Sequence, residues 1–223
     1  MADPFKAAAE NSPIDILENK IIVMQLKAVI FDLGGVIIRT EDRTPRIKLA
    51  EEFGMSYEEL SNLVFDNESA RLATVGKMTT QEHWETVRNT LGIENDAFSH
   101  VPRLFWAGDA VDNGLMNYLR SLRSRYKIGL LSNAWDDLRE RITGVWKIDD
   151  TFDEIVISAE VGLAKPDVRI YEMAVERLRA LPGEAVFVDD FKENVEAARS
   201  AGLQAIHFRG TNQVLAELDL MLD

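Results

Sequence analysis

The sequence predicts an α/β fold: a Rossmann-like, doubly wound parallel sheet that carries an inserted small helical domain. Three observations support this class. Short apolar runs recur without polar alternation, which is typical of parallel strands buried on both faces. Amphipathic helical segments separate the later runs, as in alternating strand–helix folds. One long stretch after the first run carries helix signals and no convincing strand, so we expect it to be an insert.

The expected strands are short runs rich in Val, Ile, Leu or Phe. Four are clear and one is weaker, and they occupy residues 28–31, 128–131, 155–157, 185–188 and, most weakly, 205–208. Helices are expected between the later strands, at 168–179 and 192–201, because their apolar residues recur on one helical face. Gly202 follows the second helix and suits its C-terminal cap.

The stretch from 41 to 113 is expected to be a helical cap. Pro45 and Gly54 suit the start and end of one helix, and Gly92 the end of another. Two segments match the capping-box pattern, Ser-Tyr-Glu-Glu at 56–59 and Thr-Thr-Gln-Glu at 79–82. The predicted organisation is therefore an N-terminal extension (1–24), an α/β core (25–40 and 114–223) and the cap (41–113).

Composition narrows the functional classes. The 223 residues hold 38 acidic and 25 basic side chains, a net charge of −13, so nucleic acid is not an expected partner. The absence of cysteine excludes disulfides and thiolate chemistry. Neither a secretory signal nor a membrane-spanning run is apparent, and we expect a cytoplasmic protein with no membrane partner, either a monomer or a homodimer.

Polar side chains follow three of the predicted strands. Asp32 follows the first, Ser132 and Asn133 follow the second, and Asp189 and Asp190 follow the fourth. Carboxyl ends of parallel strands share one edge of a sheet, where ligands bind. Clustered carboxylates repel one another unless a cation intervenes, and oxygen ligands without cysteine favour Mg²⁺.

Lys165 follows the strand expected at 155–157 and could bring positive charge to the same edge. Taken singly, each of these residues is more simply a turn residue, a helix cap or a surface lysine. Together they supply complementary chemistry, because a carboxylate nucleophile can approach a phosphoryl group only when cations offset the repulsion.

These motifs resemble those of the haloacid dehalogenase superfamily. The matching segments are FDLGGV at 31–36, LSN at 131–133, KP at 165–166 and VDD at 188–190, with Asn194 four residues further on. The closest likeness is to the N-terminal phosphatase domain of soluble epoxide hydrolase and to bacterial sugar-phosphate phosphatases. The resemblance implies a magnesium-dependent phosphatase of a small phosphorylated metabolite.

The resemblance also implies roles for individual residues. Asp32 would be the nucleophile that becomes an aspartyl-phosphate. Asp32, the Gly34 carbonyl and Asp190 would hold Mg²⁺, with Asp189 and Asn194 supporting the metal site. Ser132, Asn133 and Lys165 would bind the phosphate, and Ser132 and Lys165 would act in catalysis with Asp32.

Gly34 departs from the pattern of most phosphatases in this family, which carry an acid–base Asp at that position. General acid–base help is typically worth roughly 10²–10⁴-fold. Two alternatives therefore stay open: a 2-haloacid dehalogenase-type hydrolase, and a catalytically impaired ligand-binding protein. A Tyr at position 34 and a motif other than two acids at 189–190 would suit the dehalogenase better.

Several other side chains have two interpretations. His83 could replace the missing acid, although a packed or surface histidine is the simpler interpretation. Trp135 could contact substrate or dock the cap, or it could simply pack. Three aromatic residues of the cap could line a pocket, although its core is the simpler interpretation: Trp84, Phe105 and Trp106. Two arginines, Arg139 and Arg141, are expected on solvated helix faces.

Overall fold

The computed structural model describes residues 16–17, 20–21, 25–94 and 98–222. The expected N-terminal extension, 1–24, lies mostly outside the described residues. Of it, only β1 (Ile16–Leu17) and β2 (Lys20–Ile21) are described, and they pair antiparallel. No helix in the described part of the chain combines the length and apolar character needed to cross a bilayer.

A five-stranded parallel sheet forms the centre of the molecule. Its order is β7–β6–β3–β8–β9. The strands are β3 (Ala28–Phe31), β6 (Lys127–Ser132), β7 (Glu154–Ile157), β8 (Ala185–Asp189) and β9 (Gln204–His207). All five coincide with the predicted runs to within one or two residues, which confirms the predicted α/β class. Every residue of β3 and β8 is buried, in keeping with central parallel strands.

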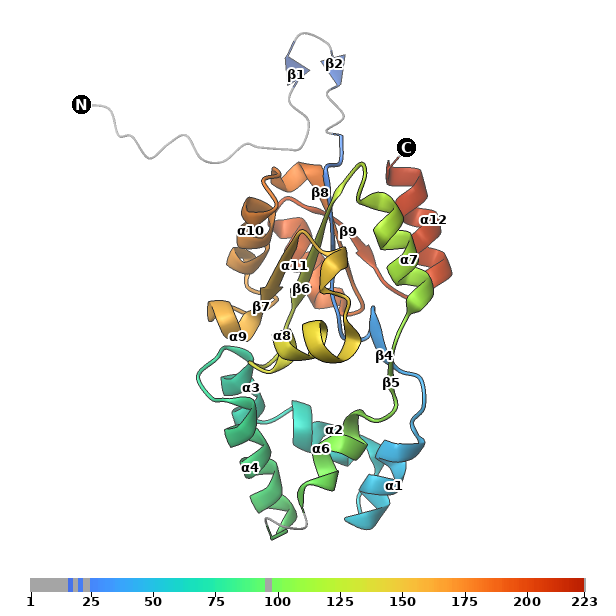
Figure 1. The fold of residues 1–223 in the computed structure, drawn as a ribbon. Coiled ribbons are helices and arrows are strands. Elements are labelled where there is room, and N and C mark those ends of the chain that lie inside the picture. Colours follow the sequence, from blue (N-terminus) through green and yellow to red (C-terminus); the bar gives the residue numbers. More distant parts are fainter. Residues whose placement is uncertain (1–15, 18–19, 22–24, 95–97, 223) are drawn as a thin grey trace, which may run out of the picture.

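Helices cover both faces of this sheet (Figure 1). On one face lie α7 (Asn113–Leu122) and α12 (Thr211–Leu222), and on the other α10 (Val168–Arg177) and α11 (Lys192–Ser200). Within β3, Val29 and Phe31 pack toward the first pair and Ala28 and Ile30 toward the second. Shorter elements complete the core: α8 (Leu138–Glu140), η1 (Arg141–Trp146), η2 (Asp149–Thr151), α9 (Ser158–Val161) and η3 (Pro182–Glu184).

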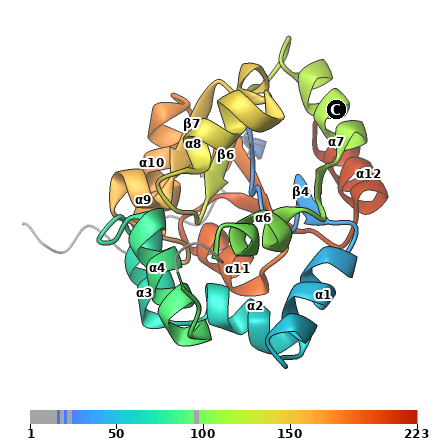
Figure 2. The same ribbon diagram turned by 60° about the horizontal axis from the view of Figure 1, so that its bottom comes forward.

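A layer of short helices lies beyond the carboxyl ends of the strands (Figures 1 and 2). It leaves the core through β4 (Ile38–Thr40) and returns through β5 (Asp109–Val111), which pair antiparallel. The expectation that 41–113 contains no strand is wrong at β5, which pairs only because β4 lies beside it. The helical layer consists of α1 (Thr44–Glu52), α2 (Tyr57–Phe65), α3 (Glu68–Thr74), α4 (Thr80–Leu91) and α6 (His100–Trp106).

The local signals in this layer act as predicted. Both capping boxes form: the side chains of Ser56 and Thr79 accept backbone N–H bonds, while Glu59 and Glu82 bond back to the N-cap amides. Gly92 ends α4 in the left-handed conformation that glycine adopts without strain.

The helical layer also contacts the core outside β4 and β5. Gly76, in the α3–α4 turn, lies so close to α9 that a Cβ there would be 2.1 Å from the carbonyl oxygen of Ala159. Nearby, the Thr80 amide donates to Asp136 Oδ1 at 2.9 Å. Trp135, from the loop after β6, packs into the apolar core of the layer. These contacts hold the layer over the sheet edge.

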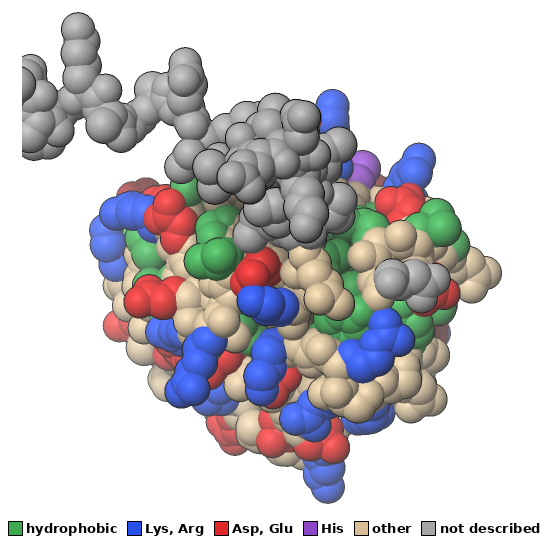
Figure 3. All heavy atoms as spheres, turned by 90° about the horizontal axis from the view of Figure 1, so that it is seen from above, with side chains coloured by type: hydrophobic (Ala, Val, Ile, Leu, Met, Phe, Trp, Pro, Cys, Tyr) green, Lys and Arg blue, Asp and Glu red, His purple; other side chains and the backbone are tan. Residues whose placement is uncertain are grey.

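The opposite end of the molecule carries interspersed acidic and basic side chains (Figure 3). Two ion pairs at the amino ends of the strands are typical of it: Lys27 with Glu184 at 2.6 Å and Lys127 with Asp153 at 2.9 Å. Such exposed pairs contribute little to stability.

Two glycines allow the contact between layer and core to be tested. Gly76 and Gly92 share a φ of +68°, but a Cβ at Gly92 would meet nothing within 4 Å. Gly92→Ala should therefore cost only the left-handed strain, about 1–2 kcal/mol. Gly76→Ala should lower the free energy of unfolding by about 1–3 kcal/mol more, because the backbone of α9 or of the turn must move. Chemical denaturation measures the free energy of unfolding of the two variants.

Hydrogen exchange distinguishes docking from simple strain. In Gly76→Ala, exchange at the amides of α9 and the α3–α4 turn should quicken relative to Gly92→Ala. Equal destabilisation of the two variants, with unchanged exchange at α9, would show that the close approach at Gly76 does not hold the layer in position.

Candidate active site

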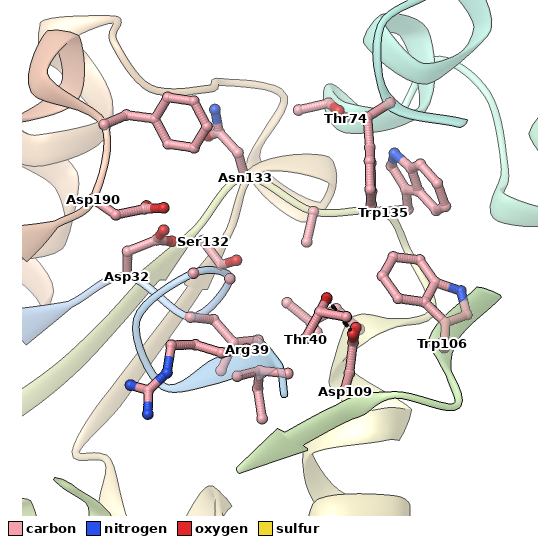
Figure 4. Close-up of a pocket in the computed structure, with 18 of the residues that line it drawn as sticks. Asp32, Arg39, Thr40, Thr74, Trp106, Asp109, Ser132, Asn133, Trp135 and Asp190 are labelled. Atoms are coloured by element: carbon pink, nitrogen blue, oxygen red, sulfur yellow. Dashed lines mark hydrogen bonds between the residues drawn. The ribbon is translucent and has the colours of Figure 1, made fainter. Parts of the chain in front are cut away.

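The polar residues that end three adjacent strands meet at one edge of the sheet (Figure 4). Strand β3 lies between β6 and β8, so Asp32 is flanked by Ser132 on one side and by Asp189 and Asp190 on the other. One carboxylate oxygen from each of the three aspartates lies within 4.8 Å of the others. The adjacency expected from the sequence is thus what parallel register produces.

Lys165 joins two of these carboxylates. Its Nζ lies 2.7 Å from Asp32 Oδ1 and 2.7 Å from Asp189 Oδ2. All three side chains are almost completely buried. A buried ammonium between two carboxylates is a strong, charge-assisted arrangement, and removing one partner would leave an uncompensated charge.

Two asparagines hold this arrangement in position. The Asn133 side chain donates to the Lys165 carbonyl oxygen and accepts from the Lys165 amide, both at 2.8 Å. Asn194 donates to both oxygens of Asp189 at 3.1 Å, and the Phe191 amide donates to Asp189 at 2.8 Å. In this geometry the Asn133 side chain positions Lys165, a role that the sequence reasoning missed.

The cluster has unusual electrostatics. Burial raises the pKa of Asp32 to about 7; Lys165 opposes the rise, and the neighbouring Asp189 adds to it. Burial and the Asp189 charge likewise raise the pKa of Asp190. Burial alone would lower the pKa of Lys165, but the two carboxylates outweigh it and raise the pKa, so the ammonium is charged. In the described part of the chain, Lys165 is thus the one cation in ion-pair contact with these three carboxylates.

The turn after Asp32 accommodates Asp190. Gly35 has a φ of +79°, and a Cβ there would be 2.1 Å from Asp190 Oδ2. Only glycine permits this approach, a function that the sequence reasoning did not assign to Gly35. Gly34 differs: a Cβ built on it meets nothing within 4 Å, and its φ lies outside the left-handed region.

The cluster fits a divalent cation. Asp190 Oδ1 is buried and, among the described residues, has no hydrogen-bond partner. Asp189, by contrast, is already satisfied by Lys165, Asn194 and the Phe191 amide. Hard oxygen donors with excess negative charge and no sulfur or imidazole suit Mg²⁺.

A cavity of about 850 Å³ opens between this cluster and the helical layer. Asp32, Asp190 and Ser132 lie on one side of it, and Trp106, Thr40 and Asp109 lie on the other (Figure 4). Further walls come from aromatic and arginine side chains: Tyr57, Phe65, Trp135 and Trp146, and Arg39, Arg43, Arg46 and Arg141.

The structure decides between the interpretations left open for the aromatic residues. Trp135 packs in the core of the helical layer and also lines the cavity. Trp84 and Phe105 belong to that core, as expected, whereas Trp106 also reaches the cavity.

His83 is not among the residues that line the cavity. It is fully buried, with its Nδ1 2.7 Å from Ser69 Oγ and its ring 4.4 Å from that of Trp135. Burial lowers the pKa of His83, which keeps it neutral. The packed interpretation of this histidine is therefore the one that the geometry supports.

Of the two arginines expected on solvated helix faces, one is exposed. Arg139 is exposed and pairs with Glu160 at 2.6 Å. For Arg141 the expectation is wrong: this side chain is half-buried in the cavity wall, 4.7 Å from the ring centroids of Trp106 and Trp146.

The chain is similar in sequence to proteins of known activity. The chain is 28% identical over 215 residues to bifunctional epoxide hydrolase 2 of Sus scrofa, covering 88% of this chain and 39% of that protein, so it spans less than half of that relative. It is 28% identical over 187 residues to a phosphorylated carbohydrates phosphatase of Thermotoga maritima, covering 82% and 84% of the two chains.

Solved structures share the fold. A haloacid dehalogenase family enzyme of Bacteroides thetaiotaomicron, in complex with magnesium and inorganic phosphate, superposes with a TM-score of 0.68 at 23% identity, over 81% of this chain and 93% of that one. The family model for haloacid dehalogenase-like hydrolases matches residues 26–202. The chain therefore belongs to the haloacid dehalogenase-like hydrolases and is an enzyme of that superfamily.

Proposed function

We propose that this hydrolase cleaves the phosphate ester of a small metabolite, with Asp32 as nucleophile and Mg²⁺ as cofactor. One observation carries the proposal: Lys165 Nζ lies 2.7 Å from Asp32 and from Asp189 at the edge of the cavity. A carboxylate can approach an anionic phosphoryl group only where positive charge offsets their repulsion. The carbohydrate phosphatase relative, and a D-ribitol-5-phosphate phosphatase from Bacteroides thetaiotaomicron that is 23% identical over 89% of this chain and 99% of that protein, support phosphorylated small molecules as substrates.

In the first step, an oxygen of Asp32 attacks phosphorus. Lys165 engages Oδ1, so Oδ2 is the oxygen assigned to the attack. The new O–P bond forms as the bond to the leaving oxygen breaks, giving an aspartyl-phosphate and an alkoxide that takes a proton. In the second step, water attacks the same phosphorus, which releases inorganic phosphate and restores the carboxylate.

The neighbouring residues bind and orient the phosphate. Ser132, buried at the end of β6, would donate its hydroxyl to a phosphoryl oxygen, and the Lys165 ammonium would neutralise part of the charge. Asn133 and Asp189 act through Lys165, because both bond to it.

The metal would be held by Asp32, Asp190 and the Gly34 carbonyl, with Asp189 and Asn194 in support. When bound, it would supply positive charge to the transferring phosphoryl group and to the carboxylates. The buried Asp190 Oδ1, which has no hydrogen-bond partner among the described residues, would gain such a partner. A carboxylate oxygen that lacks a partner also favours a phosphatase over a 2-haloacid dehalogenase, because the dehalogenase reaction at carbon needs no metal.

Residues 41–113 would act as a cap over the reacting centre. The helical layer supplies one wall of the cavity and meets the core through β4, β5 and a few side chains. Closure of such a layer excludes water and fixes the substrate.

The first test concerns the metal. Mg²⁺ should bind the wild-type protein, and Asp190→Asn should weaken binding by at least roughly tenfold, because a carboxylate with an unpaired oxygen is lost. Asp137→Asn is the matched control, a cavity carboxylate outside the aspartate cluster. Calorimetry measures both. Equal Mg²⁺ affinity in wild type and Asp190→Asn would remove Asp190 from the site.

The second test concerns the nucleophile. Asp32→Asn should lower turnover of p-nitrophenyl phosphate by at least about 10⁴-fold, since an amide cannot form the acyl phosphate. Circular dichroism should show an unchanged fold, and beryllium fluoride should bind the wild type alone. Chloroacetate assayed in parallel reports dehalogenase activity. Substantial phosphatase activity in Asp32→Asn would refute the mechanism.

The third test concerns Gly34, which provides no side-chain acid. The wild-type rate should depend steeply on leaving-group pKa, because departure of an alkoxide needs a proton. Gly34→Asp should flatten that dependence and speed alkyl phosphate hydrolysis, up to the roughly 10²–10⁴-fold general-acid term.

The structure supplies a control for this test. Gly34→Asp should keep its melting temperature, because a Cβ there meets nothing within 4 Å, whereas Gly35→Ala should lose both stability and activity. A shallow slope already present in the wild type would mean that another cavity group or a water supplies the proton.

A further inference from the structure

Arg141 occupies a local backbone irregularity. It opens η1, a single π-helical turn from Arg141 to Trp146. In an α-helix, residues five apart point about 140° away from each other, at roughly 100° per residue. The wider π turn instead brings Trp146 beside Arg141, so that the guanidinium lies 4.7 Å from the centroid of its ring. Such single π turns occur frequently at functional sites.

A second indole contacts the same guanidinium from the helical layer. Trp106, at the end of α6, also has its ring centroid 4.7 Å from Arg141. A ring contact uses the face of a guanidinium, whereas its N–H groups lie in the plane and remain available to an acceptor. The two ring contacts of Arg141 therefore do not use its N–H groups as hydrogen-bond donors to an oxygen.

No carboxylate neutralises Arg141 within the described residues. Two acids, Asp109 and Asp137, lie near enough to influence its charge, but neither makes a hydrogen bond or ion pair with it. Both are already engaged: Asp109 accepts from Thr40 at 2.7 Å, and Asp137 accepts from Thr80 at 3.1 Å. Two other arginines of the cavity differ, since Arg39 pairs with Asp112 and Arg46 with Asp109. Arg43 also lines the cavity, but it is exposed and contacts the ring of Tyr57.

Arg141 contacts a residue on the side of the cavity opposite the reacting groups. It lines the same cavity as Asp32, Ser132 and Lys165. Its partner Trp106 lies on the side opposite Asp32 and Asp190 (Figure 4). A phosphate held at the aspartate edge would thus extend its leaving group toward the guanidinium.

We propose that Arg141 binds a second anionic group, a carboxylate or a phosphate, on the leaving-group side of the substrate. This assignment rests on the proposed phosphatase function and narrows its substrate class to phosphomonoesters with a distal anion. A half-buried, unpaired guanidinium gains most from an ionised, planar or bidentate acceptor. A neutral alkyl or sugar leaving group would leave it unsatisfied.

The experiment compares matched substrates in the presence of Mg²⁺. A series of alkyl phosphates of increasing length is assayed beside ω-carboxyalkyl phosphates and alkanediol bisphosphates of the same lengths. At the best length, kcat/KM for the doubly anionic ester should exceed that of the alkyl ester by roughly 10- to 100-fold. The two anionic arms distinguish a carboxylate from a phosphate.

Variants assign the preference to Arg141. Arg141→Gln should bring the ratio of kcat/KM for the doubly anionic ester to that for the alkyl ester close to one. Arg141→Lys keeps the charge but loses the planar guanidinium, so it should retain part of the preference. Arg139→Gln is the matched control: Arg139 is exposed, pairs with Glu160 and does not line the cavity, so the ratio should stay at the wild-type value. Calorimetry on Asp32→Asn should show the same order of affinities without turnover.

Two outcomes overturn the assignment. The first is that the wild type hydrolyses alkyl and carboxyalkyl phosphates equally well. The second is that Arg141→Gln lowers kcat/KM for the two kinds of ester equally, together with the melting temperature. In either case Arg141 would only stabilise the contact between the helical layer and the core through Trp106. If the wild type hydrolyses no phosphate ester, including p-nitrophenyl phosphate, the proposed function itself fails and this assignment falls with it.

Discussion

The buried ammonium of Lys165, held between the carboxylates of Asp32 and Asp189, is the interaction on which the site depends. Removing charged groups from water is costly, and only close opposite charge and further hydrogen bonds compensate. Asn133 aligns the lysine backbone, and Asn194 satisfies Asp189. Loss of one member of such a buried group typically costs about 3–5 kcal/mol, so the chemistry and the packing of this edge are linked.

One cation among three carboxylates leaves the edge negatively charged. Burial raises the pKa of Asp32 and of Asp190, and the charge of Asp189 adds to both rises, whereas Lys165 opposes them. The excess of negative charge makes the edge receptive to a divalent ion, since Asp190 keeps a buried oxygen without a partner in the described chain. Gly35 permits the crowding, because any side chain there would overlap the Asp190 carboxylate. A protein with a net charge of −13 would thus depend on a few local cations to receive the anionic substrate proposed above.

The helical layer and the core contribute different side chains to the cavity. The core edge supplies the carboxylates, Ser132 and Lys165, while the layer supplies Trp106, Tyr57 and Phe65. Arg141 belongs to the core but reaches toward the layer through its contact with Trp106. A shift of the layer would therefore change the surroundings of Arg141 while leaving the Lys165 ion pairs intact. This would separate the proposed recognition of the leaving group from the proposed phosphate chemistry.

Local sequence determined much of this protein. Buried parallel strands need continuous apolar runs, so the strands were predictable, and with them the polar residues at their carboxyl ends. Capping boxes and Gly92 act within one turn, and their helices formed as predicted. Contacts between distant segments were decided only by the tertiary structure. Strand β5 exists because β4 lies beside it, and Gly35 matters because Asp190 comes within contact. Arg141 resembled a solvated helix residue because an α-helical period was assumed; the π turn and the approach of Trp106, 35 residues earlier, depend on packing that no local pattern encodes.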